Sequence, residues 1–252
     1  MSEMGKNAND GRPSTLPLDA LAEDLFGLNF RALRTVKVLW FSPKTYFDSA
    51  KTIDWADNFT PSIRLWLSFF ALFSALKFWW LGGNDGMITA FADGFENAGL
   101  ILPEGTSYRD IGRDTVLWVF GLIPILQIVI MVVLSLIWPF WGEHTTAALR
   151  QRYFFSIIVP SASLMPVFMT LMMLVPSNHL TGYGIAIAIV AFSVDFQTGL
   201  RGGFSTFSGF SKVWRAGLLA FVVVVLNVST SIAAQIAGII VTSQTYGVVP
   251  QG

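Results

Sequence analysis

Five long apolar segments constrain what this chain can fold into more than any other feature of its sequence. Each approaches or exceeds the roughly 20 residues that an α-helix needs to cross about 30 Å of hydrocarbon. Only 13% of the 252 residues are charged, against about 25% in an ordinary soluble domain. The sequence therefore predicts an all-α, polytopic membrane bundle of about five transmembrane helices. The expected spans are residues 63–81, 115–140, 153–174, 182–199 and 213–240.

The spans divide the rest of the chain into regions of different character. Residues 1–17 are polar and rich in Gly, Asn and Pro, so we expect a disordered tail. Residues 18–60 are expected to form cytoplasmic or interfacial amphipathic helices. The membrane domain then covers residues 61–242, with an external loop at 83–114, and residues 243–252 form a short external tail.

Basic residues in the connecting segments predict the orientation. Lys and Arg are retained on the cytoplasmic side of a membrane, whereas acidic residues contribute little. Eight of them lie in the N-terminal region up to Arg64, and others lie between spans two and three and between spans four and five. With five spans these regions share one side, so we expect the N-terminus inside and the C-terminus outside.

Basic and aromatic residues near the expected boundaries are candidates for contact with the membrane interface. In LNFRALRTVKVLW the cations recur every third residue while Leu33, Val36 and Trp40 gather on another face, which is typical of an interfacial helix. The alternative is a cytoplasmic helix packed on the rest of the protein. Ser42-Pro43 then predicts an N-cap and a first-turn proline for a second short helix. The interface candidates here and near the first span are Arg31, Arg34, Lys37, Trp40, Lys77, Trp79 and Trp80.

The stretch RGGFSTFSGFSK places a phenylalanine at every third position between the last two spans. We interpret it as a flexible loop or short turn that dips Phe204, Phe207 and Phe210 into the interface while Arg201 and Lys212 meet anionic headgroups. A docking surface for a partner protein and a gating element are the alternatives.

Residues that could support catalysis are few. There is no cysteine, and the two histidines, His144 and His179, are expected on opposite sides of the bilayer. We find no phosphate-binding loop, zinc motif or nucleophile motif, and the zero net charge offers no field for nucleic acid. The sequence thus predicts no catalytic residue, no cofactor and no metal site, and a membrane-embedded lipid enzyme is a distant third reading.

Polar residues inside the spans are the usual indicators of a transport path. Asn227, Ser231 and Gln235 repeat every four residues in the last span, with Gln127 as a possible partner. Such groups normally hydrogen-bond between helices, so we favour helix contact over permeation. Asp195 is expected at the cytoplasmic boundary, and Lys77 is expected to extend to the interface.

Small residues four apart in the last span predict close helix packing, either within the chain or between copies. They form two pairs, Ala233 with Ala237 and Ala234 with Gly238.

Three segments resemble the Yip family of small five-span membrane proteins, especially its bacterial branch. VLWFSPKTYFDSA is similar to the family's pre-membrane segment, GEHTTAALRQRYFFSIIVPSASLMP to its link between spans two and three, and FSGFSKVWRAGL to its entry into the last span. DLFGL, at Asp24 to Leu28, departs from the family's Asp-Leu-Tyr-Gly-Pro motif: it lacks the proline and lies well before the first span. The resemblance implies the bacterial cytoplasmic membrane and a non-enzymatic adaptor, but not binding to small GTPases.

Two functions are consistent with this pattern. The first is a non-catalytic scaffold, adaptor or accessory subunit that acts through the lipid bilayer and through protein partners or homo-oligomers. The alternative is a small transporter or channel that uses the polar stripe of the last span.

Overall fold

The computed structural model describes residues 30–52, 54–83, 86–136, 140–142, 145–172, 174–247 and 249–250. Five long helices dominate this part of the chain, and each is long and apolar enough to cross a membrane. The predicted all-α bundle is therefore confirmed, and the five candidate spans indicate an integral membrane protein. The long helices are α5 (Ser62–Gly83), α7 (Tyr108–Ser135), α8 (Ala147–Met172), α9 (Leu180–Thr198) and α10 (Gly209–Tyr246). The expected tail at residues 1–17 lies outside the described residues.

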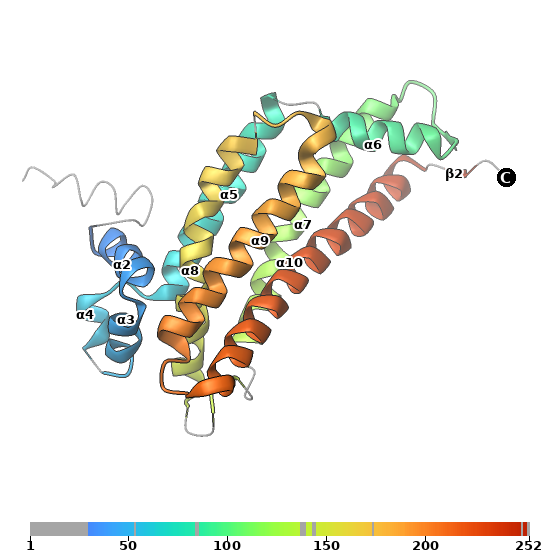
Figure 1. The fold of residues 1–252 in the computed structure, drawn as a ribbon. Coiled ribbons are helices and arrows are strands. Elements are labelled where there is room, and N and C mark those ends of the chain that lie inside the picture. Colours follow the sequence, from blue (N-terminus) through green and yellow to red (C-terminus); the bar gives the residue numbers. More distant parts are fainter. Residues whose placement is uncertain are drawn as a thin grey trace, which may run out of the picture.

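The long helices pack side by side around a shared interior (Figure 1). The most extensive contacts join α7 to α10 and α5 to α8, and α9 packs against both α8 and α10. Short 3-10 helix η2 (Ser177–His179) connects α8 to α9, and π-helical turn η3 (Gly199–Gly203) follows α9. Neighbours in sequence thus become neighbours in space on the α8 to α10 side of the bundle.

Helix ends differ from the predicted span limits for identifiable reasons. Helix α7 begins well before residue 115 because Ser107 and Asp110 form a reciprocal capping box. Helix α10 continues past residue 240 to Tyr246, where Gly247 adopts the left-handed conformation (φ 60°) that commonly terminates helices. The last helix has 38 residues, more than a bilayer requires.

Helix α6 (Gly86–Asn97) lies across one end of the bundle, in the loop that was expected to be external (Figure 1). Its buried residues Ile88, Ala92 and Phe95 face α7. Gly112 of α7 allows this contact, because a Cβ there would lie 2.6 Å from the Ile88 carbonyl oxygen. A two-residue antiparallel pairing of β1 (Leu100–Ile101) with β2 (Val249–Pro250) ties the chain's C-terminal part to the same end.

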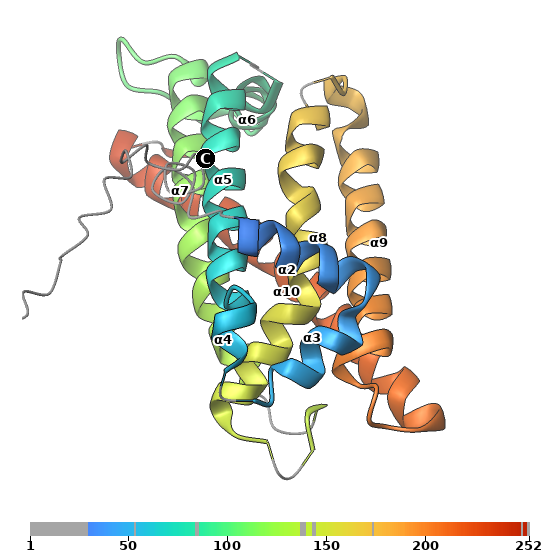
Figure 2. The ribbon, with the colours of Figure 1, turned by 90° about the vertical axis from the view of Figure 1, so that its left-hand side faces the viewer.

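An N-terminal arm of three short helices lies against one side of the bundle, between its middle and the end away from α6 (Figure 2). It comprises α2 (Phe30–Phe41), α3 (Pro43–Ser49) and α4 (Trp55–Asn58). Helix α2 crosses α8, and its buried residues are Ala32, Thr35 and Leu39. The arm therefore packs on the bundle, as one of the two alternatives anticipated.

The outward face of α2 differs from the predicted one. Trp40 turns toward the bundle, where its Nε1 donates to Ser163 Oγ of α8 (3.2 Å), and its side chain is partly buried; its assignment to the membrane interface stays a prediction. Phe30, Leu33 and Phe41 are the large apolar residues exposed on this helix. At 100° per residue they share a face with Arg34 and Lys37, which are also exposed. An interfacial role for this face stays a prediction.

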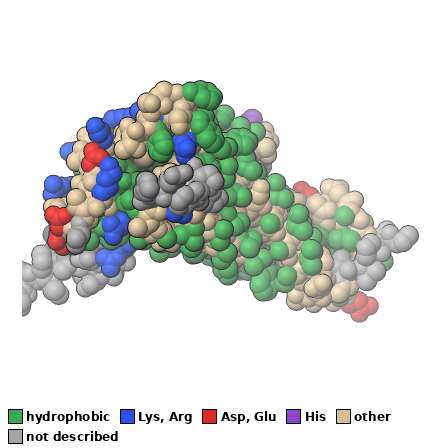
Figure 3. Space-filling model, turned by 90° about the horizontal axis from the view of Figure 1, so that it is seen from below, with side chains coloured by type: hydrophobic (Ala, Val, Ile, Leu, Met, Phe, Trp, Pro, Cys, Tyr) green, Lys and Arg blue, Asp and Glu red, His purple; other side chains and the backbone are tan. Residues whose placement is uncertain are grey.

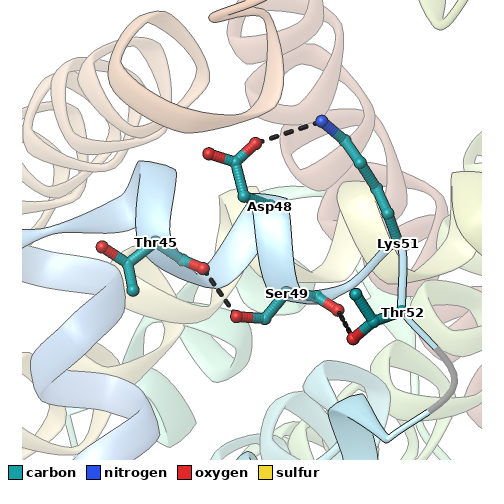
Figure 4. A network of polar contacts seen from close by, with 5 residues as sticks. All are labelled: Thr45, Asp48, Ser49, Lys51 and Thr52. Atoms are coloured by element: carbon teal, nitrogen blue, oxygen red, sulfur yellow. Dashed lines mark hydrogen bonds and ion pairs between the residues drawn. The ribbon is translucent and has the colours of Figure 1, made fainter.

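Helix α3 ends in a small surface network of polar contacts (Figure 4). Lys51 Nζ lies 3.1 Å from Asp48 Oδ1, and the Ser49 and Thr52 hydroxyls donate to the carbonyl oxygens of Thr45 and Ser49. Exposed ion pairs of this kind contribute only about 0–1 kcal/mol. At the start of α3, Pro43 occupies the first turn as predicted, whereas Ser42 occupies the N-cap position without a side-chain capping bond.

Lysine and arginine side chains gather over the arm and the neighbouring loops when the molecule is seen from below (Figure 3). Much of the remaining surface in this view is hydrophobic. Several arginines bind backbone carbonyl oxygens where helices end. The donor and acceptor pairs are Arg31 with Ala56, Arg150 with Leu136, Arg152 with Ala50, Arg201 with Trp40 and Phe41, and Arg215 with Phe140.

Arg201 is one of the arginines that bind carbonyl oxygens at a helix end. Its NH2 donates to the carbonyl oxygen of Phe41 (2.7 Å) and its NH1 to that of Trp40 (3.3 Å). It thereby satisfies carbonyl groups that the end of α2 leaves without a partner in the helix. Arg201 therefore fastens the arm to the link between α9 and α10, and its predicted contact with headgroups stays a prediction.

The RGGFSTFSGFSK stretch is ordered, and its three phenylalanines have different environments. Phe204 is fully buried and stacks on Trp141 at 5.3 Å between ring centroids, so its prediction as an interface residue is wrong. Phe207 is partly buried, with the Arg215 guanidinium 4.5 Å from its ring centroid. Phe210 alone of the three is largely exposed, at 81%. The backbone at Gly203 packs closely on Ile157, since a Cβ at this position would lie 2.7 Å from Ile157 Cδ1.

Candidate functional site

A cavity of about 200 Å³ lies between the five long helices. Its wall is mostly aromatic and aliphatic, yet every one of the five helices contributes at least one polar side chain to it. These polar residues are Lys77 of α5, Gln127 of α7, Ser161 of α8, Asp195 of α9, and Asn227 and Ser231 of α10. Polar groups gathered from all spans at one interior point are the strongest candidate for a functional site in this bundle.

Gln127 and Asn227 form a direct bridge between α7 and α10 at the cavity wall. Gln127 Nε2 donates to Asn227 Oδ1 at 2.6 Å, which is the partnership expected from the sequence. Ser231 lies one turn further along and its hydroxyl donates to the Asn227 carbonyl oxygen at 3.1 Å.

Gln235 does not join this group, although it continues the four-residue repeat. Four residues advance about 400° on a helix, so each step drifts by about 40°. Gln235 is therefore rotated by about 80° from Asn227, and its side chain is exposed on the outside of the bundle. Its prediction as part of the polar stripe is wrong for this geometric reason.

Asp195 is the most deeply buried ionisable side chain of the cavity, at 1% exposure. Its Oδ1 has no hydrogen-bond partner within the described part of the chain. Ser161 of α8 is its polar neighbour, and the same hydroxyl also donates to the Ile158 carbonyl oxygen at 2.9 Å. The sequence favoured a position at the membrane boundary, whereas the structure places Asp195 inside the bundle.

Lys77 also faces the cavity, instead of extending to the interface as predicted. Its Nζ lies 4.3 Å from the ring centroid of Phe73 and 5.5 Å from that of Phe120. Aromatic faces attract a cation electrostatically, and more so where water is scarce. Trp79, by contrast, is 67% exposed, and the side chain of Trp80 lies outside the described residues.

The aromatic wall of the cavity was not anticipated, although the sequence contains a signal for it. Trp66, Phe70, Phe73 and Lys77 follow one another at intervals of three or four residues, so they share one face of α5. If this aromatic face is assigned to the interior of the bundle, Lys77 is predicted to face inward as well. Ser161, between two prolines of α8, offered no comparable signal.

One of the two predicted small-residue pairs forms an internal helix contact. Ala234 and Gly238 are buried, and a Cβ on Gly238 would lie 2.8 Å from Val119 Cγ2 of α7. Ala233 is exposed and Ala237 is partly buried. The close approach of α10 to α7 therefore uses the second pair.

Replacing Asn227 with leucine should destabilise the bundle, because it leaves the Gln127 amide without its partner across the helix interface. Hydrogen bonds between membrane helices contribute roughly 0.6–2 kcal/mol, so we expect a lower melting temperature in detergent. Gln235→Leu is the matched control on the same helix, and its outward position predicts no loss. Equal loss in both variants would contradict the assignment of the bridge.

Among the described residues no group of three His, Cys, Asp or Glu side chains could hold a metal ion. His179 is exposed in η2, while His144 lies outside the described residues. No family model, curated protein or solved structure matches this chain.

Proposed function

We propose that this integral membrane protein binds a small polar solute in the central cavity and carries it between the two sides of the membrane. The observation that supports this most directly is the buried Asp195 carboxylate, with an oxygen that lacks a partner, in the wall of that cavity. A buried polar oxygen without a partner costs about 1–3 kcal/mol, because the hydration it loses on burial is not replaced. Such a group is retained more readily where a bound solute supplies the missing interaction.

The size of the cavity favours a metabolite-sized solute. Sites for drug-sized ligands are commonly about 300–1,000 Å³, whereas this one is about 200 Å³. We further propose that the N-terminus lies inside and the C-terminus outside a bacterial cytoplasmic membrane, on the basis of the distribution of Lys and Arg.

Filling the cavity should abolish transport. We expect Ala191→Phe, which places a ring in the cavity wall of α9, to eliminate solute uptake by proteoliposomes, measured by stopped-flow light scattering with a panel of small polar solutes. Ala186→Phe on the exposed face of the same helix is the control and should retain uptake. Absence of uptake of every solute by the wild-type protein, or equal uptake by both variants, would contradict the proposal.

A non-catalytic scaffold or accessory subunit is the second candidate, and the resemblance to the Yip family is consistent with it. It is favoured by an apolar groove of about 390 Å³ at the α6 to α10 junction, lined by Phe91, Gly94, Phe95 and Ile239 among others.

Replacing Gly94 with leucine tests whether a partner binds in this groove. A Cβ on Gly94 would meet nothing within 4 Å, so Gly94→Leu fills the groove without a clash inside the chain. If a partner occupies the groove, the wild-type protein in mild detergent should have the mass of a complex that is larger than the single chain. In Gly94→Leu this mass should fall to that of the single chain. A single chain in both proteins would count against a partner.

A further inference from the structure

We infer that a pocket between the arm, α5 and α8 binds the headgroup phosphate of an anionic phospholipid. The pocket has a volume of about 180 Å³ and shares no lining residue with the central cavity. Its polar side chains are those of Ser62 in α5 and of Gln151 and Arg152 in α8, and its apolar ones include Trp55 of α4. Among the described residues of this wall Arg152 is the one that carries a charge, so the pocket suits a negatively charged ligand.

The contacts of Arg152 hold its guanidinium in place and leave donors for a ligand. The guanidinium carbon lies 4.4 Å from the ring centroid of Trp55, and NH1 donates to the Ala50 carbonyl oxygen at 3.0 Å. A guanidinium has five N–H donors, and Arg152 forms no ion pair within the described part of the chain. Its remaining donors can therefore bind two phosphate oxygens at once, a geometry that lysine does not offer.

The pocket lies where two candidate membrane spans begin. The apolar segment of α5 starts at Ser62 and that of α8 at Ala147, and Ser62 Oγ donates to the Arg152 carbonyl oxygen at 3.0 Å. This bond sets the two helix starts at one level, which is the level of lipid headgroups if both helices cross a bilayer. With the orientation proposed above, these headgroups belong to the cytoplasmic leaflet, where anionic lipids attract basic residues.

The apolar side of the pocket favours a lipid over a free phosphate ion. Ile63 lines the pocket and is 37% exposed. Leu67 is 40% exposed and lies on the same face of α5, because residues four apart are neighbours on a helix. The two side chains form an outward apolar path that leads from the pocket along the first span. An acyl chain can lie on this path while the phosphate contacts Arg152, whereas inorganic phosphate gains nothing from it.

The wall also favours an anionic headgroup over a zwitterionic one. The ammonium group of a zwitterionic phospholipid needs a carboxylate close to the phosphate site. Asp54 and Asp57, the acidic residues within two positions of Trp55, are exposed and do not line the pocket. Within the described residues of the wall an ammonium group thus meets the charge of Arg152 without a balancing carboxylate, whereas phosphatidylglycerol meets only attraction.

Three probes separate the lipid from its headgroup and from its charge. They are dioctanoyl phosphatidylglycerol, dioctanoyl phosphatidylcholine and inorganic phosphate. We expect the first to bind the purified full-length protein at least about tenfold more tightly than the other two, because it alone combines a net negative charge with acyl chains. Ligand-induced thermal stabilisation in a non-ionic detergent and native mass spectrometry measure the binding.

Two positions of α8 test whether this pocket is the site. Ala148→Phe fills it from an exposed position and leaves Arg152 in place, so the affinity for phosphatidylglycerol should fall to that for phosphatidylcholine. Ala147→Phe, which is exposed and outside the wall, is the matched control and should keep the wild-type affinity. Arg152→Gln should lose the preference for the anionic lipid, and Arg152→Lys should lose part of it, because lysine keeps the charge without the planar fork.

Each contrary result overturns a stated part of the assignment. Absence of phosphatidylglycerol binding, or equal binding of the two lipids by the wild-type protein, would refute an anionic lipid site. Inorganic phosphate that binds as tightly as phosphatidylglycerol would show an anion site that does not take a lipid. Phosphatidylglycerol binding that survives Ala148→Phe unchanged would place the lipid elsewhere. None of these outcomes bears on uptake through the central cavity, which Ala191→Phe tests separately.

Discussion

Asparagine at position 195 should raise the melting temperature of the empty protein while it weakens solute binding. The wild-type carboxylate is 1% exposed and one of its oxygens has no hydrogen-bond partner. An unsatisfied buried polar group costs about 1–3 kcal/mol, and more when it is charged. Asparagine has nearly the same shape but no charge, so less hydration is lost on burial. In a chain of this size, each kcal/mol corresponds to roughly 2–4 °C in melting temperature.

The same substitution removes the carboxyl group that we propose the solute contacts in the cavity wall. Hydrogen bonds to such a group contribute about 0.5–3 kcal/mol, depending on its charge, so binding of the transported solute should fall roughly 2- to 100-fold. Thermal denaturation without solute and equilibrium dialysis with that solute measure the two effects on one preparation. Asp57→Asn, an exposed position of α4, is the control and should change neither. An unchanged affinity together with a lower melting temperature would show that Asp195 is a structural residue.

Alanine at position 204 should produce the largest loss of stability among the three phenylalanines of the RGGFSTFSGFSK stretch. Phe204 is fully buried, stacks on Trp141 and lies 6.2 Å from Phe207 between ring centroids. Truncation of a buried phenylalanine costs about 3–5 kcal/mol, because it removes apolar contact and leaves a cavity. We expect the melting temperature, measured by tryptophan fluorescence, to fall by roughly 6–20 °C.

Phe210→Ala is the matched control six residues further along the chain. Its ring is 81% exposed, and exposed substitutions usually change stability by less than about 0.5 kcal/mol. If the two variants melted at the same temperature, the buried position of Phe204 would be refuted. A drop confined to Phe210→Ala would restore the sequence-based interpretation of an interface loop.

The sequence was sufficient to predict the five helices because lipid imposes one length and one composition on each span. It also identified Gln127 and Asn227 as candidate partners, since buried amides on two spans satisfy each other. Apart from the aromatic stripe of α5, it did not indicate which side of each helix faces inward, because the outer surface of a membrane bundle is as apolar as its interior. Lys77 and Asp195 were both expected at boundaries, whereas the structure places both at the cavity wall.

The interpretation of the RGGFSTFSGFSK stretch as one interface surface was wrong for a different reason. Its spacing was interpreted as a single surface, but the backbone changes conformation twice within it, from the π-helical turn to a loop and from the loop to the start of α10 at Gly209. Each phenylalanine therefore faces a different environment. The packing of Phe204 on Trp141 depends on a contact between residues 63 positions apart (204 minus 141), which local spacing cannot reveal.

The arginines at the helix ends bear on how the protein responds to its surroundings. The acceptors of Arg201 are the backbone carbonyl oxygens of Trp40 and Phe41, and a guanidinium keeps its proton in proteins. Neither of these two contacts depends on an acidic side chain that a fall in pH could neutralise. The contact of Arg201 with the end of α2 therefore keeps the arm fastened to the bundle when the medium becomes acidic, a condition under which an attachment built from ion pairs would weaken.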